Sequence, residues 1–253
     1  MMVEETILVT VKTYPNISSK YVETVCTAGI NERGEWRRLY PIRFRHLEGE
    51  KQFKLYDRIK VRLEEHSSDG RIESRRPRTD TIQVLGRLTQ WNLRYEWVQG
   101  TIVDSLKELE ERGGSIGPVR VSRVMEWYWK DSPRDWTPKQ LEILKQQPLF
   151  DDEMPKALEK VPYEFRIRWL DGRGHEHDNL FMAWEVFETW RKYRFRYTQP
   201  LQVMKDKWMN DILSDDRLLC FFMGNIAQRR NRFMVCGIYN PPKREIDKNE
   251  SLF

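Results

Sequence analysis

Residues 53–65 read FKLYDRIKVRLEE, and the second half of this stretch indicates the fold. Apolar and charged residues alternate there, and the apolar positions are Ile59, Val61 and Leu63. A period of two is the pattern of a β-strand with one buried face. We therefore expect a strand whose charged side chains face solvent.

Similar patterns surround this stretch over the first hundred residues. Strands are expected at 6–13, 22–30, 35–40 and 81–88, and turn sequences follow at 31–34 and 67–70. Several short strands joined by turns are typical of a small barrel or sandwich. The N-terminal part is therefore predicted to form a β-barrel-like sheet.

The rest of the sequence mixes helices and strands. One helix is expected to be capped by Thr101 and stopped by Gly113 and Gly114, and a second opens at Thr137 and Pro138. Further strands are expected at 119–129, 163–170, 218–223 and 233–238, and further helices at 182–195 and 201–213. The predicted class is α+β, with a C-terminal α/β portion that closes the barrel.

The acidic residues 151–153, between Pro148 and Pro155, are the best candidate for a linker. We therefore expect a β-rich portion with two helices over 1–150 and an α+β portion over 151–242 that packs on it. Residues 243–253 are predicted to be a flexible polar tail.

Composition limits the classes of function. The chain of 253 residues has 44 Lys and Arg against 39 Asp and Glu, and its arginines cluster locally, which suggests a polyanionic partner. Its 3 cysteines form no CxxC pair, and no apolar run approaches the ~20 residues that cross a bilayer. We expect a cytoplasmic protein with no membrane partner and no cofactor; the oligomeric state stays open.

The stretch WRRLYPIRFRH, residues 36–46, holds four arginines and three aromatic residues. Guanidinium groups grip phosphate oxygens, and flat rings stack on unpaired bases. The alternative is a half-buried strand with aromatic residues inward and arginines in solvent. Two further arginine clusters, at 71–78 and 229–232, favour nucleic acid, with DNA preferred to RNA. The candidate binding residues are Lys12, Tyr14, Trp36, Arg37, Arg38, Tyr40, Arg43, Arg45, Arg75, Arg76, Arg78, Arg229, Arg230 and Arg232.

Two groups of residues are candidates for chemistry. In the first, His175, Glu176, His177 and Asp178 precede Glu185, and this group is interpreted as a solvated turn, an acid–base site or a metal site. In the second, strand pairing would bring Lys12, Tyr14, Glu23 and Cys26 to one barrel mouth, where Glu23 activates water and Lys12 holds a phosphate. The candidate catalytic residues are Glu23, His177, Asp178 and Glu185, and no metal ligand is assigned.

The pairing of residues 53–65 with FFMGNIAQRRNRFMVCGI, residues 221–238, resembles PUA, ASCH and EVE-type β-barrels. The resemblance covers about a quarter of the chain, and it implies a PUA-like barrel that binds RNA or a flipped modified base in DNA. In general character the chain is also similar to phage-defence DNA glycosylases that remove modified bases.

These observations lead to one hypothesis and two alternatives. The hypothesis is a phage-defence DNA glycosylase that flips a base into an aromatic pocket, with a modified base as the favoured substrate. The expected stacking partners are Trp36, Tyr40, Tyr14 and Trp184. The alternatives are a reader of modified DNA or RNA without catalysis, and a metal-dependent nuclease that uses residues 175–178.

Overall fold

The computed structural model describes residues 2–64, 69–145, 158–226 and 229–246. The strands of the first half are β1 (Met2–Lys12), β2 (Asn16–Ser18), β3 (Val22–Thr24), β4 (Thr27–Asn31), β5 (Trp36–Leu39), β6 (Asp57–Glu64), β7 (Ser74–Pro77) and β8 (Gln83–Arg87). The later strands are β9 (Ile116–Asp131), β10 (Tyr163–Asp171), β11 (Glu176–Leu180), β12 (Cys220–Ile226) and β13 (Arg229–Tyr239).

The helices are shorter and lie mainly in the second half of the chain. The α-helices are α1 (Trp91–Val98), α2 (Leu106–Glu111), α3 (Pro138–Lys145), α4 (Trp184–Tyr193), α5 (Pro200–Lys207) and α6 (Lys243–Ile246). Short turns of 3-10 helix are η1 (Phe44–His46), η2 (Gly49–Lys51), η3 (Thr79–Thr81) and η4 (Gln99–Thr101), and a π-helical turn, η5 (Trp208–Ile212), extends α5. Among the described residues, no helix combines the length and the apolar character that crossing a membrane requires.

Five N-terminal strands close into a barrel. They pair in the order β1-β4-β5-β7-β6, and β6 pairs back with β1, which closes the ring. The β5–β7 pair is parallel and the other pairs are antiparallel, while β8 extends the sheet from β6. The mixed α+β class and a barrel are therefore confirmed.

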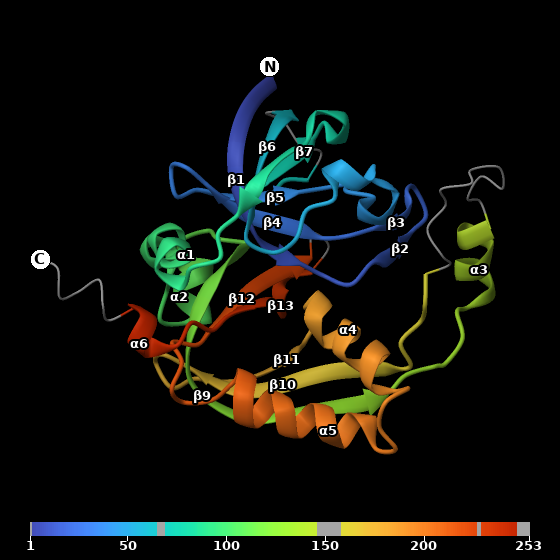
Figure 1. Cartoon of the computed structure of the whole chain (residues 1–253), viewed down its shortest axis with the longest axis vertical. Coiled ribbons are helices and arrows are strands. Elements are labelled where there is room, and N and C mark those ends of the chain that lie inside the picture. Colours follow the sequence, from blue (N-terminus) through green and yellow to red (C-terminus); the bar gives the residue numbers. More distant parts are fainter. Residues whose placement is uncertain (1, 65–68, 146–157, 227–228, 247–253) are drawn as a thin grey trace, which may run out of the picture.

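A second, open sheet follows in the order β11-β10-β9-β12-β13, with every pair antiparallel. Figure 1 shows the barrel on one side of the molecule and this sheet on the other, and both views place α4 and α5 beside the sheet. Thr13 at the end of β1 bridges Ala183 just before α4, so the two sheets meet there.

The first strand, β1, serves two cores because its side chains alternate between its faces. Ile7 and Val9 point into the barrel, whereas Leu8 and Val11 pack with Phe222 of the second sheet. In a regular strand Val9 and Val11 would lie on the same face. The register with β4 shifts between them, and the two side chains therefore face different cores. In β6 the predicted alternation is confirmed, since Ile59, Val61 and Leu63 are buried.

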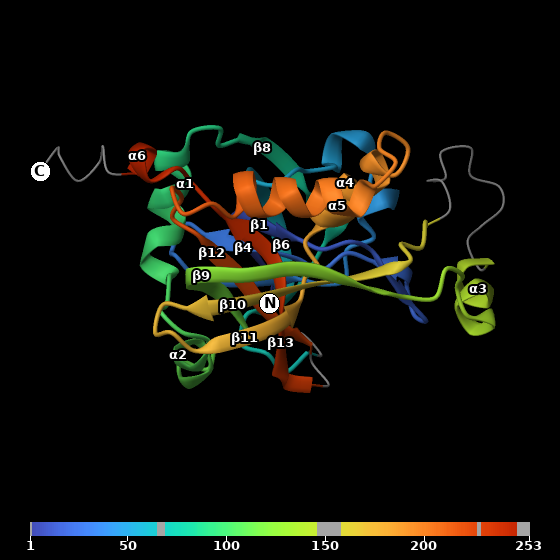
Figure 2. The ribbon, with the colours of Figure 1, turned by 90° about the horizontal axis from the view of Figure 1, so that it is seen from below.

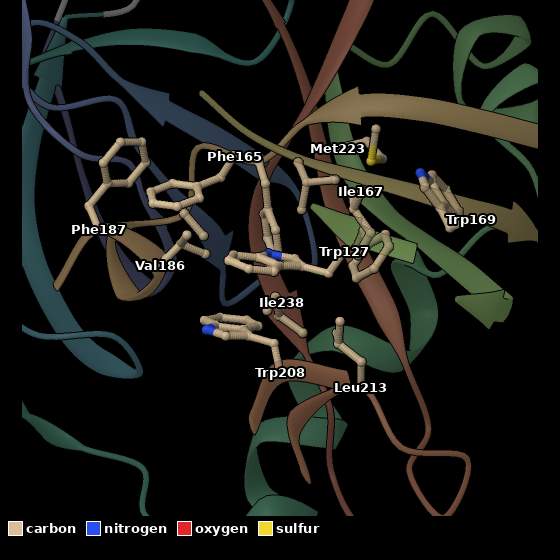
Figure 3. Packing of buried hydrophobic residues seen from close by; sticks show 14 of the residues in the cluster. Trp127, Phe165, Ile167, Trp169, Val186, Phe187, Trp208, Leu213, Met223 and Ile238 are labelled. Carbon is tan, nitrogen blue, oxygen red and sulfur yellow. The ribbon is translucent and has the colours of Figure 1, made fainter. Parts of the chain in front are cut away.

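The core of the second sheet is largely aromatic (Figure 3). The ring of Trp127 on β9 stacks on Trp208, with centroids 6.3 Å apart, and on Phe165, at 5.5 Å. Val186 and Phe187 bring α4 onto the same cluster. These rings thus hold α4 and α5 against the sheet.

Two boundaries differ from those expected. Strand β9 pairs with β10 and β12, so a division at residue 150 cuts the second sheet in two. The helix expected from Thr101 begins instead after Ser105, whose Oγ accepts from the Glu108 amide. The Glu108 carboxylate in turn accepts from the Asp104 amide at 3.1 Å, which makes this later start the better cap.

The expected tail is ordered at its beginning. Residues of α6 form a helical turn in which Ile246 is buried. The candidate linker at 151–153 and the end of the tail, 247–253, lie outside the described residues.

Candidate functional site

A hollow of about 420 Å³ opens at one end of the barrel. We call it the arginine hollow; its lining residues are Tyr21, Pro41, Arg43, His46, Leu47, Glu64, Arg76, Pro77, Arg78, Thr79 and Asp80. They come from the β2–β3 hairpin, η1, the end of β6, the end of β7 and η3. The lining is thus assembled from five separate segments, because barrel closure brings the ends of β6 and β7 beside η1.

The three arginines of the hollow differ in how they are held. Arg76 lies 3.9 Å from Glu64, and Arg78 lies 3.4 Å from Asp80, with both guanidinium groups about half exposed. Arg43 has no ion pair within the described residues, and its buried Nε has no hydrogen-bond partner there. Its Nη2 lies 3.5 Å from the His46 ring. Cationic donors with weak or absent partners are suited to an anionic ligand.

Two tyrosines stand at the edge of the hollow. Tyr21 lines it, and the ring of Tyr40 meets Tyr21 edge-on at 6.1 Å. Tyr40 is 39% exposed, and Lys20 lies 5.3 Å above the Tyr21 ring. A ring pair beside guanidinium groups is the combination that binds a base and its phosphate.

Behind the hollow lies a buried carboxylate. Glu23 is 1% exposed, and its oxygens lie 3.1 Å from Arg45 and 3.7 Å from His46. Burial raises the pKa of Glu23, although Arg45 and Arg43 oppose that shift. His46 lines the hollow, so it connects the hollow to Glu23.

The stretch 36–46 is only partly a surface. Trp36 is buried against Phe222, with ring centroids 5.5 Å apart, and Arg37 is tied to Glu5 and Glu35. Assigning Trp36 and Arg37 to nucleic acid is wrong, because both faces of β5 are covered.

Arg38 is also buried, and it belongs to a polar network between the two sheets. Its Nε donates to the Ser115 Oγ at 2.9 Å, and its Nη2 donates to the Ser115 carbonyl. The Ser115 amide and hydroxyl both donate to Glu73, at 2.7 Å each. Burial lowers the pKa of Arg38. Its expected contact with nucleic acid is therefore wrong.

Lys12 of β1 and Glu185 of α4 are near enough for their charges to attract each other. The Lys12 ammonium lies 3.8 Å from the Phe44 ring centroid and 4.4 Å from that of Trp184. Burial lowers the pKa of Lys12 to about 8, against the attraction of Glu185. Burial raises the pKa of Glu185, whose Oε2 has no hydrogen-bond partner among the described residues.

The predicted barrel mouth is not formed as expected. The expected strand pairing is formed in part, since Lys12 pairs with Thr27 and the Thr13 amide donates to the Cys26 carbonyl at 3.0 Å. Glu23 does not join them, because it lies on β3, which pairs with β2, and the Cys26 Sγ lies 3.9 Å from Arg38. Tyr14 stacks on Phe187 at 4.7 Å and donates to the Glu159 carbonyl. Tyr14 and Trp184 are thus parts of the packing between the barrel and α4, and their rings are not available for stacking on a base.

The histidine cluster is organised around a buried carboxylate. The Asp171 Oδ2 lies 3.2 Å from the His175 Nδ1 and 2.9 Å from the His177 Nε2. Burial disfavours the Asp171 anion, yet hydrogen bonds from His177 and His175 leave its pKa below its ordinary value. Asp178 does not join this cluster; it accepts a hydrogen bond from Tyr128 and forms an ion pair with Arg166. In the described part of the chain, no group of three or more His, Cys, Asp or Glu is placed to hold a metal ion.

The predicted arginines thus divide into groups. Arg43, Arg76 and Arg78 meet at the arginine hollow, while Arg45 is bound to Glu23 behind it. Exposed positions remain for Arg229, Arg230 and Arg232 at the start of β13, and Arg75 is half-buried on β7. Tyr21 and His46 line the hollow but were not among the predicted binding residues. Lys20 before Tyr21, and the position of His46 at the end of WRRLYPIRFRH, could have indicated them.

The fold and the hollow together define a mixed α+β protein that combines a closed five-stranded barrel with an open five-stranded sheet. The chain belongs to the family described as a domain of unknown function, DUF8757, whose model matches residues 99–253. The model of a second domain of unknown function, DUF8758, matches residues 3–100. No curated protein matches the chain.

Proposed function

We propose that the chain is a nucleic-acid-binding protein that holds one nucleotide in the arginine hollow. The observation that supports this most is the meeting of Arg43, Arg76 and Arg78 with the Tyr21–Tyr40 ring pair. A volume of about 420 Å³ lies within the range of small-ligand pockets. In this proposal the arginines bind phosphate, and the two rings stack on the base.

The acidic residues of the hollow are compatible with this proposal. Glu64 and Asp80 leave a small positive surplus against the three arginines. Their ion pairs are long and exposed, and such pairs contribute little to stability. A phosphate therefore replaces them at small cost, and Arg43 needs no pair to be broken.

The closed barrel also supports the PUA-like part of the proposal. A nucleotide bound at the end of a small barrel is the mode implied by the resemblance to PUA, ASCH and EVE-type domains. Within it, a reader without catalysis is favoured, because none of the carboxylates predicted to be catalytic lines the hollow among the described residues. DNA remains the preferred nucleic acid.

The test measures affinity for a short fluorescein-labelled single-stranded DNA by anisotropy over a series of salt concentrations. Each of the variants Arg43→Gln, Arg76→Gln and Arg78→Gln is expected to weaken binding about fivefold to tenfold. Each should also reduce the slope of log K against log salt by about 1, because one phosphate contact is lost.

The matched control is Arg62→Gln. Arg62 lies on β6 with an exposed side chain 3.8 Å from Glu4, and it does not line the hollow. This variant should bind as the unaltered protein does. Equal losses for Arg62→Gln and the hollow variants, or a flat salt response throughout, would reject the proposal.

A second candidate is hydrolysis of the N-glycosidic bond by a DNA glycosylase. The observation that favours it is the contact of His46, in the hollow, with the buried Glu23. In that reaction water adds to the sugar carbon and the base departs with a proton. His46 would handle that proton and Glu23 would position the ring.

An abasic-site assay on modified and unmodified duplexes separates the two candidates. The glycosylase is supported if the unaltered protein produces alkali-labile strands and His46→Gln does not. It also requires that Glu23→Gln change the pH profile of their formation. Binding without abasic sites supports the reader.

A further inference from the structure

An exposed isoleucine stands at the tip of a tightly braced loop beside the barrel. Ile72 is 76% exposed in the loop 69–73, which we call the Ile72 finger. The finger leads directly into β7, whose last residues line the arginine hollow. Single exposed apolar side chains are common on protein surfaces, so an interaction site here depends on what surrounds Ile72.

The finger is held by a network centred on Asp69. The Asp69 carboxylate accepts from the side chain and the amide of Arg71 and from the Ser74 hydroxyl, the last at 2.8 Å. The Ser74 amide donates to the Arg71 carbonyl at 3.1 Å and closes the turn. The tip of the loop is therefore fixed in position, although the Ile72 side chain is not packed against the protein.

The same loop is joined to the β12–β13 hairpin. Arg71 Nη1 donates to the Asn225 carbonyl at 2.6 Å, and Asn225 Nδ2 donates to the Arg230 carbonyl at 2.8 Å. A Cβ at Gly70 would lie 3.0 Å from Arg230 Nη2, so the finger and the hairpin are in contact. Ile226, 40% exposed, is a second apolar side chain on this face.

The charge of this face is positive. Within the described residues, Arg75, Arg229, Arg230 and Arg232 form no ion pair, and Glu73 is buried under the finger against Ser115. An apolar tip surrounded by uncompensated arginines matches the proteins that insert a wedge into a nucleic-acid duplex while binding its phosphates.

We propose that the Ile72 finger and the first residues of β13 bind double-stranded nucleic acid, with Ile72 inserted between bases and the arginines on the phosphates. This inference rests on the proposed function, because it assigns a second contact to the same partner. Pro77 of the hollow lies five positions after Ile72, which sets a limit of about 17 Å on the distance between their Cα atoms. One duplex therefore reaches both sites.

The experiment compares a fluorescein-labelled duplex with a single strand of the same sequence. Ile72→Ala and Arg230→Gln should each weaken binding of the duplex about tenfold and leave binding of the single strand unchanged. Insertion is followed with 2-aminopurine in the duplex, whose fluorescence should rise with the unaltered protein and stay low with Ile72→Ala. Leu85→Ala, which removes another exposed apolar side chain, on β8, is the matched control.

The outcomes separate the two proposals. If Arg76→Gln weakens both ligands but Ile72→Ala and Arg230→Gln change neither, the finger proposal is overturned and the hollow stands. If duplex binding depends on Ile72 while single-strand binding ignores Arg43 and Arg76, the finger stands and the hollow proposal fails. If duplex binding is unchanged in all finger variants, the inference is rejected. The same result is expected if the finger binds a protein partner.

Discussion

Replacement of Glu73 by glutamine is expected to lower the free energy of unfolding by about 3 kcal/mol, since it leaves the Arg38 guanidinium buried without its counter-charge. Ser115 links the two groups, accepting from Arg38 and donating to Glu73, and all three residues are buried. Glutamine keeps the shape but loses the charge. Urea unfolding of the unaltered protein and of Glu73→Gln measures the difference.

Two further variants make this result specific. Glu4→Gln removes a carboxylate from an exposed ion pair with Lys60 at 2.7 Å, and it should cost much less stability than Glu73→Gln, because solvent screens the pair. The double variant Arg38→Met, Glu73→Gln should recover part of the loss, because no buried charge remains. If Glu73→Gln costs no more than Glu4→Gln, the network does not hold the two sheets together as inferred.

This network also shows what the sequence leaves undetermined. Residues 36–46 present arginines at a spacing that fits either a binding surface or a covered strand. Covering β5 requires the second sheet, and the partner Ser115 lies 77 positions from Arg38. Local pattern therefore predicts strand β5 but not the burial of Arg37 and Arg38, because Glu5, which pairs with Arg37, and Ser115 are remote in the chain.

The hollow was predictable to a similar, limited degree. The arginines at 43, 76 and 78 indicated an anion site, and the alternation in β6 indicated a sheet. Closure of the barrel depends on the pairing of Ile7 with Ile59, which no local pattern specifies. Tyr21 and His46 reach the hollow only through that closure, so their role could not be read from their neighbours.

The second large effect concerns the Lys12–Glu185 pair. The double variant Lys12→Met, Glu185→Gln is expected to unfold with a free energy about 2 kcal/mol above that of the unaltered protein near pH 7. Lys12 lies between the rings of Phe44 and Trp184, and burial shifts both ionisable groups toward their neutral forms. Replacing such a pair by uncharged side chains of similar size removes the cost of desolvating both.

The gain should depend on pH in a defined window. The pKa of Lys12 falls from 10.5 to about 8 in the folded protein, so the unfolded chain binds more protons between these values. The cost of the buried ammonium is therefore full below about pH 8 and disappears as pH rises toward about 10.5. The pKa of Glu185 is raised from 4.5, so its cost is absent below that value and grows as pH rises.

Urea unfolding at about pH 4, 7 and 10.5 tests this window, with the difference between double variant and unaltered protein as the measured quantity. The difference should be largest at the middle pH and smaller at both ends. Each single variant should be less stable than the double one, because it leaves one buried charge unpaired. Neither residue lines the arginine hollow, so single-stranded DNA should bind the double variant normally. A gain in stability that is the same at all three pH values would mean that the charges of Lys12 and Glu185 are not its cause. Loss of DNA binding would instead indicate that Lys12 binds phosphate, as expected from the sequence.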